Sequence, residues 1–164
     1  MDAVNVGEFK IGDEQPLYFI AEIGINHNGE IDLAKKLIKT AKDSGCNAVK
    51  FQKRNPELCV PLAQRNVMRE TPWGIITYFD YRKKIELGEK EYDEIDRYCK
   101  EIGITWFASA WDNDSIDFLA RYNLPCYKIP AAKLTDDAFL KHLRAQGRPM
   151  FLSTGMSSLE QLDH

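Results

Sequence analysis

Short apolar runs alternate with segments of helical periodicity along most of the chain. The runs predict five strands, at residues 17–23, 48–52, 105–109, 126–129 and 149–153. The segments between them carry apolar residues three and four positions apart, which predicts helices at 32–42, 89–102, 114–122 and 136–145. Strands that alternate with helices in this way are typical of a parallel sheet with right-handed crossovers.

The two ends of the pattern carry smaller elements. Residues 9–11 read as a short strand followed by a turn at 12–14, which predicts a hairpin or plug over residues 1–16, before the core begins at residue 17. Asp114 is the predicted cap of the helix at 114–122. Near the other end, Ser157 is placed to cap a further helix through Glu160.

Two closures fit this α/β pattern. A doubly wound sheet of five strands would be complete at 164 residues, whereas a (β/α)₈ TIM barrel of ~250 residues would be a little over half present. The glycines at 24–29 do not have the Gly-x-Gly-x-x-Gly spacing that follows the first strand of dinucleotide-binding folds. The spacing therefore argues against a dinucleotide site.

Residues 53–88 interrupt the alternation with a long insertion. We expect no strand there, one or two helical turns at 62–68 and a chain break at 71–74. The insertion is rich in aromatic residues, which a disordered linker would not carry. We therefore expect an ordered loop that covers a site or contacts a partner.

Composition narrows the classes of function. The chain is 44% hydrophobic, which is typical of a globular domain, and its net charge of -3 is spread among mixed charges, so nucleic acid is not an expected partner. No apolar run approaches the ~20 residues that cross a bilayer. The four cysteines lie far apart without a Cys-x-x-Cys pair, and no secretory signal precedes them. We expect reduced, non-catalytic thiols in a cytoplasmic protein.

Polar side chains follow the apolar runs at the point where each predicted strand ends. They are Glu22, Asn26, His27, Lys50, Gln52, Ser109, Lys128 and Ser153. The carboxyl ends of parallel strands meet at the edge of the sheet where ligands bind. This pattern predicts an enzyme or a small-molecule binder.

Each charged residue has a structural alternative. Lys50 and Lys128 lie among apolar strand residues, which is costly unless an anion is near, although both could also be lysines that reach an exposed edge. Glu22 is a candidate proton-transfer group in a partly dry site and a candidate salt-bridge partner of these lysines, and the two roles are not exclusive. His27 is equally an acid or base and a loop histidine bonded to the backbone. Asn26 is a candidate for binding a ligand through its side-chain amide.

Five blocks in order, at 20–29, 49–53, 107–110, 127–129 and 152–156, resemble the N-terminal half of the sialic acid synthase family. The resemblance implies a TIM barrel, usually followed by a small antifreeze-like domain that reaches into the other subunit of a homodimer. It also implies an activity. The family condenses phosphoenolpyruvate with N-acetylmannosamine, another N-acyl-mannosamine or the 6-phosphate, giving N-acetylneuraminate or a related nonulosonic acid and phosphate.

The resemblance also implies roles for individual residues. Lys50 and Lys128 would hold phosphoenolpyruvate, Ser109 and Ser153 would line its pocket, and Glu22 would meet the acceptor sugar. Ala110 and Ala131 stand where some members carry a hydroxyl group that touches this ligand.

A divalent metal, Mn²⁺ or Mg²⁺, is implied for the full-length enzyme. Its histidine ligands in the family lie beyond the fifth strand, so we expect no metal ligands in this chain, whose three histidines are scattered. We therefore expect residues 17–164 to be a truncated barrel with little activity alone. Two alternatives stay open: a non-catalytic fragment that pairs with a full-length subunit, and a related barrel that condenses phosphoenolpyruvate with another aldose.

Overall fold

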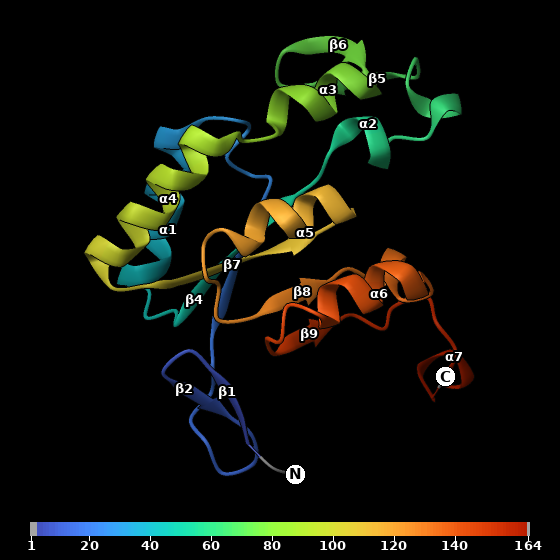
Figure 1. Ribbon diagram of the computed structural model, residues 1–164. Coiled ribbons are helices and arrows are strands. Elements are labelled where there is room, and N and C mark those ends of the chain that lie inside the picture. Colours follow the sequence, from blue (N-terminus) through green and yellow to red (C-terminus); the bar gives the residue numbers. More distant parts are fainter. Residues whose placement is uncertain (1–2, 164) are drawn as a thin grey trace.

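A five-stranded parallel sheet runs through the computed structural model, which describes residues 3–163 (Figure 1). Its strands lie in the order β3, β4, β7, β8 and β9. Their bounds are Ile20–Gly24, Ala48–Lys53, Thr105–Ala110, Tyr127–Ile129 and Met150–Leu152. This spatial order is the order of the sequence. A doubly wound sheet reverses direction partway, so the structure decides for the singly wound course of a barrel.

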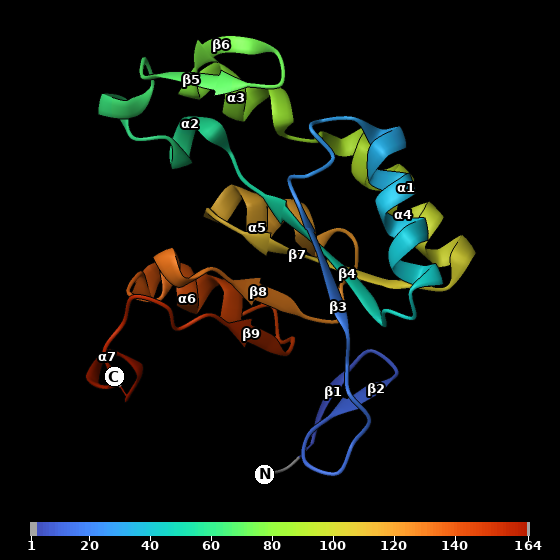
Figure 2. The same ribbon diagram turned by 180° about the vertical axis from the view of Figure 1, so that it is seen from behind.

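The helices between these strands cover one face of the sheet. They are α1 (Ile31–Asp43), α4 (Glu89–Ile102), α5 (Asn113–Ala120) and α6 (Asp137–Arg144), and α7 (Leu159–Asp163) follows the last strand. In Figure 2, which views the molecule from behind, the strands lie in front of α5 and α6. The predicted alternation of strands and helices is confirmed, with end points that differ by a few residues.

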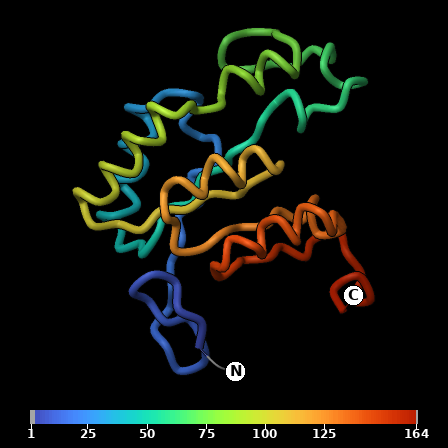
Figure 3. Tube along the Cα trace, in the orientation of Figure 1, coloured from blue at the N-terminus to red at the C-terminus, as the bar shows by residue number. Residues whose placement is uncertain are grey.

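The N-terminal hairpin is present, but its turn is not the predicted one. β1 (Val4–Val6) pairs antiparallel with β2 (Phe9–Ile11), and Gly7 turns the chain between them with a φ of 60°. The predicted turn at 12–14 instead leads out of the hairpin toward β3. The tube in Figure 3 shows the hairpin at the opposite end of the sheet from the insertion.

The insertion contains the strands that we did not expect. β5 (Met68–Thr71) and β6 (Gly74–Thr77) form an antiparallel hairpin, and the predicted chain break at 71–74 is its turn. Around it lie α2 (Pro56–Cys59), a 3₁₀ turn (Leu62–Gln64) and α3 (Tyr78–Ile85). The hairpin is largely exposed, and an exposed strand pair needs no alternating apolar pattern. The prediction of an ordered segment is confirmed.

Two helix caps also differ from prediction. Asp112, not Asp114, caps α5, since its carboxylate accepts the Ser115 backbone N–H. Before α7, the hydroxyl of Ser158 accepts the Gln161 N–H and the Gln161 side chain accepts the Ser158 N–H. That reciprocal pair is a capping box one residue beyond the predicted one.

The main core lies between the sheet and the helices α1 and α4. Phe51 on β4 is fully buried, with its ring 6.4 Å from Tyr92 of α4 and 6.4 Å from Trp106 of β7, measured between centroids. The two outer strands keep an open flank, because β3 and β9 each pair on one side only among the described residues. Ile20 is 37% exposed and Leu152 is 45% exposed at these flanks.

Phe51→Ala is expected to lower the free energy of unfolding by ~3–5 kcal/mol, because it removes a fully buried ring and leaves a cavity. Urea unfolding followed by circular dichroism measures this change. Ile75→Ala is the matched control in the exposed hairpin, where the side chain is 70% exposed, and it should change stability by less than ~0.5 kcal/mol. Equal effects of the two substitutions would contradict the described core.

Candidate active site

Three predicted charged side chains, Glu22, Lys50 and Lys128, belong to one cluster at the carboxyl ends of the strands. The register of the sheet pairs Glu22 with Lys50 and Ser109 with Lys128. Lys50 Nζ lies 2.5 Å from Glu22 Oε2 and donates a hydrogen bond of 3.1 Å to Ser109 Oγ. Strand pairing therefore brings together side chains that the sequence could identify only as residues at the ends of separate strands.

Lys128 completes the cluster from the next strand. Its ammonium group donates to Ser153 Oγ at 2.5 Å and to the Ile129 carbonyl at 2.7 Å. Burial lowers the pKa of Lys128, the charge of Lys50 lowers it further, and Glu22 raises it. The two ammonium groups therefore interact, and a second anion beside them would stabilise both.

Lys50 does not match the alternative of a lysine that reaches an exposed edge, because its side chain is only 9% exposed. The salt-bridge alternative for Glu22 is realised, yet the Glu22 side chain remains 55% exposed. Glu22 can therefore contact a ligand while it stabilises the buried ammonium group of Lys50.

Gly24 allows Glu22 and Gln52 to approach each other. Its φ is 57°, which favours glycine, and the β3–β4 register shifts between Glu22 and Gly24. A Cβ atom there would lie 2.8 Å from Glu22 Oε1 and 3.3 Å from Gln52 Nε2. The two side chains thus meet over the glycine backbone.

The loop after β3 places its two predicted site residues differently. Asn26 is exposed, so its amide is open to a ligand. His27 is 2% exposed; its Nδ1 accepts the Gly29 N–H at 3.1 Å, and the Gly24 backbone accepts a bond from the ring. Burial lowers the pKa of His27 from 6.5 to about 4. These contacts favour the backbone-bonded alternative for His27.

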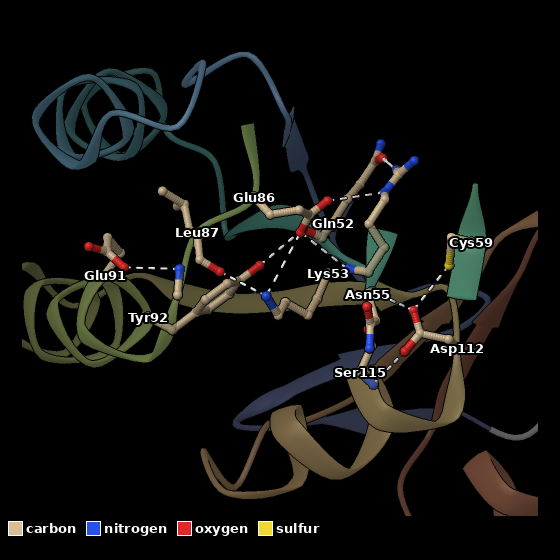
Figure 4. Close-up of polar contacts among 12 residues, drawn as sticks. Gln52, Lys53, Asn55, Cys59, Glu86, Leu87, Glu91, Tyr92, Asp112 and Ser115 are labelled. Atoms are coloured by element: carbon tan, nitrogen blue, oxygen red, sulfur yellow. Dashed lines mark hydrogen bonds and ion pairs between the residues drawn. The ribbon is translucent and has the colours of Figure 1, made fainter. Parts of the chain in front are cut away.

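A second polar cluster, which the sequence analysis did not predict, lies at the end of β4 and consists of Lys53, Arg54 and Glu86. Figure 4 shows Lys53 and Glu86. Glu86 lies 3.3 Å from Arg54 Nε and 3.8 Å from Lys53 Nζ, and its side chain is 9% exposed. Burial raises the pKa of Glu86 to about 7, although both cations lower it. The one available signal was a carboxylate between the apolar residues Ile85 and Leu87.

Asp112 and Cys59 tie the insertion to the end of β7. Asp112 accepts the Asn55 N–H at 2.7 Å and the Cys59 thiol at 3.1 Å (Figure 4). Burial and this hydrogen bond raise the pKa of Cys59 to about 12. The thiol is therefore protonated, as is typical of a structural cysteine. Trp111 stacks on Arg54, with 4.3 Å from the ring centroid to Cζ, which is a packing contact.

The described residues do not assemble a metal site: within 3–163 no group of three or more His, Cys, Asp and Glu side chains is placed to hold an ion. His142 Nε2 lies 2.7 Å from Asp117 Oδ1 on the outer helices, and His164 lies outside the described range. In that same range, no helix has both the length and the apolar character needed to span a membrane.

Comparison with known sequences gives matches along nearly the whole chain. The model of the NeuB family matches residues 37–164. The chain is 35% identical over 154 residues to the N-acetylneuraminate-9-phosphate synthase of Mus musculus, covering 93% of this chain and 43% of that protein. It is 32% identical over 153 residues to the N,N'-diacetyllegionaminic acid synthase of Legionella pneumophila, covering 92% and 43%. The chain thus spans less than half the length of these relatives.

Solved structures share the fold. The N-acetylneuraminic acid synthetase of Leptospira borgpetersenii, determined with citrate, superposes with a TM-score of 0.87 at 26% identity, over 99% of this chain and 53% of that one. A truncated 3-deoxy-D-arabino-heptulosonate 7-phosphate synthase of Thermotoga maritima gives 0.67 at 15% identity, over 98% and 48%, and at that identity shows the fold alone. The TIM-barrel-like prediction is confirmed.

The buried His27 predicts a specific pH dependence of stability. Its folded pKa of about 4 lies below the ordinary 6.5, so the unfolded chain binds the proton first and stability is lost as pH falls between these values. Between about pH 7.5 and pH 5, the wild type should lose ~2 kcal/mol more stability than His27→Gln. Urea unfolding of both proteins at both pH values measures this difference. Parallel losses in the two proteins would show that His27 titrates normally.

Proposed function

Because this chain belongs to the NeuB family of sialic and nonulosonic acid synthases, we propose that it carries the phosphoenolpyruvate site of such an enzyme. The acceptor would be N-acetylmannosamine, a related N-acyl-mannosamine or the 6-phosphate, and the product a nonulosonic acid. The observation that supports this most strongly is the convergence of Lys50, Lys128 and Glu22 at one edge of the sheet.

Phosphoenolpyruvate matches the charge of this cluster. It carries a phosphate and a carboxylate, and two ammonium groups can bind both through charge-assisted hydrogen bonds. Lys50 is buried and the pKa of Lys128 is lowered, so both ammonium groups gain from a bound anion. The hydroxyls of Ser109 and Ser153 already accept bonds from these lysines and would add neutral contacts.

The proposed reaction joins the two substrates by one carbon–carbon bond. C3 of phosphoenolpyruvate attacks the aldehyde carbon of the open-chain sugar, whose oxygen gains a proton. Water adds to C2, and cleavage of the C2–O bond releases inorganic phosphate and leaves the 2-keto acid. Lys50 and Lys128 would hold the phosphate and carboxylate, while Glu22, which is half exposed, would orient the sugar near its reacting carbon.

A divalent cation, Mn²⁺ or Mg²⁺, is the cofactor that we propose for the complete enzyme. Residues 3–163 supply no group of three ligands for it, so we assign no step of the reaction to the metal. The free thiols of the four cysteines support a reducing compartment, and we propose the cytoplasm.

Pairing with a full-length subunit is a second candidate function for the chain alone. The open flanks of β3 and β9 favour it, since an uncovered sheet edge binds another strand readily.

A homodimer is the assembly that we propose for the complete enzyme. A barrel that joins phosphoenolpyruvate to another aldose is the remaining alternative, and it uses the same anion site.

Lys128→Ala is expected to weaken phosphoenolpyruvate binding by about 10–100-fold, because it removes one charged hydrogen bond. Binding of N-acetylmannosamine should change by less than about twofold. Isothermal calorimetry with each ligand measures both affinities, and Lys36→Ala, an exposed lysine on α1, is the control that should change neither. Equal losses for the two ligands would count against the assignment.

Two further measurements test whether phosphoenolpyruvate binding needs the metal and whether the 164-residue chain is active by itself. We expect phosphoenolpyruvate to release heat without Mn²⁺, and the 164-residue chain, given both substrates, to release little or no phosphate. Absence of phosphoenolpyruvate binding with and without Mn²⁺ would contradict the proposed site. Release of phosphate with formation of a nonulosonic acid at enzymatic rates would contradict the proposal that this segment alone is inactive.

A further inference from the structure

We propose that Arg54 and Glu86 are positioning residues that fix the side-chain amide of Gln52 with its NH₂ group toward the substrate. This inference rests on the proposed function, because it assumes that phosphoenolpyruvate binds beside Lys50. Gln52 follows Lys50 by two positions on β4, so both side chains lie on the same face of the sheet. The orientation of the amide decides whether Gln52 offers a donor or an acceptor to an anionic ligand.

The contact with Arg54 determines that orientation. Arg54 Nη2 donates a short hydrogen bond to Gln52 Oε1. A guanidinium group has only donors, so the atom that faces it must be the amide oxygen and the NH₂ group must point elsewhere. Gln52 Nε2 lies over Gly24, 3.3 Å from where a Cβ would stand, and Glu22 Oε1 lies 2.8 Å from the same point. The NH₂ group is therefore directed to the side of Gln52 on which Glu22 lies.

Arg54 is itself held on two sides. It is 5% exposed, and its guanidinium group lies against the Trp111 ring. Its Nε lies 3.3 Å from Glu86 Oε1, and its backbone N–H donates to Glu86 Oε2 at 3.3 Å. Figure 4 shows the Glu86 carboxylate between the ends of Gln52 and Lys53. Glu86 belongs to the segment that joins α3 to α4, so the insertion positions a residue of the core sheet.

The ionisation of Glu86 connects this arrangement to pH. Burial raises the pKa of Glu86 to about 7, so protonation near neutrality removes much of its attraction for Arg54. Several titratable or charged groups face this carboxylate or its partners. They are Lys53 and Arg54 at the end of β4, Cys59 of α2, Tyr78 and Arg82 of α3, Glu91 and Tyr92 of α4, and Asp112 after β7. The neighbouring acid Asp112 has backbone and thiol donors of its own.

A double-mutant cycle in phosphoenolpyruvate binding tests the positioning role. Arg54→Met should weaken binding by about tenfold in the wild-type background and by less than about twofold in the Gln52→Met background, because Arg54 acts through Gln52. Arg65→Met is the matched control: this arginine pairs with Glu57 at 3.0 Å and stacks on Phe79 within the same insertion. It should leave the affinity unchanged. The same loss from Arg54→Met in both backgrounds would overturn the inference.

A second measurement needs no ligand and no Arg54 variant. In the ¹⁵N-labelled protein, the side-chain NH₂ resonances of Gln52, assigned by their loss in Gln52→Met, should shift with a midpoint near pH 7. Glu86→Gln should abolish this titration, while Glu57→Gln, at an exposed carboxylate of the insertion, should retain it. Resonances that do not titrate in the wild type, or that still titrate in Glu86→Gln, would overturn the inference. If phosphoenolpyruvate does not bind, the proposed function fails while this measurement still tests the coupling of Gln52 to Glu86.

Discussion

The burial of the Lys50 ammonium group constrains the sheet and the site together. An unpaired ammonium group in the interior costs several kilocalories per mole, so the folded chain must supply partners for it. Glu22 lies 2.5 Å away and Ser109 accepts a hydrogen bond at 3.1 Å. These partners come from β3 and β7, the strands on either side of β4. The strand order that satisfies Lys50 is therefore the order that assembles the candidate site.

Strand register has the same double role. Side chains alternate along β4, so Lys50 and Gln52 face one side while Phe51 faces the helices. A slip of one residue would place the ring of Phe51 in the site and the ammonium group of Lys50 in the apolar core. The free-energy cost of that exchange fixes the register of β4, and the register fixes the positions of the polar side chains. Glu86 also depends on this geometry. Its ion pairs with Lys53 and Arg54 hold the insertion over the end of β4.

How well each feature could be predicted depended on how local its cause is. Helix α4 was predicted at its observed bounds, Glu89–Ile102, because its apolar face is followed by a glycine, Gly103. In the structure Gly103 adopts the left-handed conformation that ends the helix. The hairpin of β5 and β6 was missed because its strands are exposed and carry no burial pattern. The polar strand ends were found from sequence because they break apolar runs. Their mutual contacts could not be, since these depend on register between distant strands.

The cluster around Glu86 is a further case in which contacts between distant residues could not be predicted from the sequence. A carboxylate between Ile85 and Leu87 carries no sequence sign of the cations that will surround it. His27 is a second example: its residue type allowed acid–base chemistry, and only the fold revealed that its ring nitrogens bond to the backbone of Gly24 and Gly29. Residue type therefore marks candidates, and burial with hydrogen bonding separates site residues from structural ones.

A crystal structure of this chain soaked with phosphoenolpyruvate tests the central claim most directly. The account predicts that the two anionic groups of the ligand lie within hydrogen-bonding distance of the ammonium groups of Lys50 and Lys128, at the carboxyl ends of β4 and β8. Phosphoenolpyruvate bound elsewhere on the molecule, with both lysines still in contact only with Glu22 and the serine hydroxyls, would contradict it.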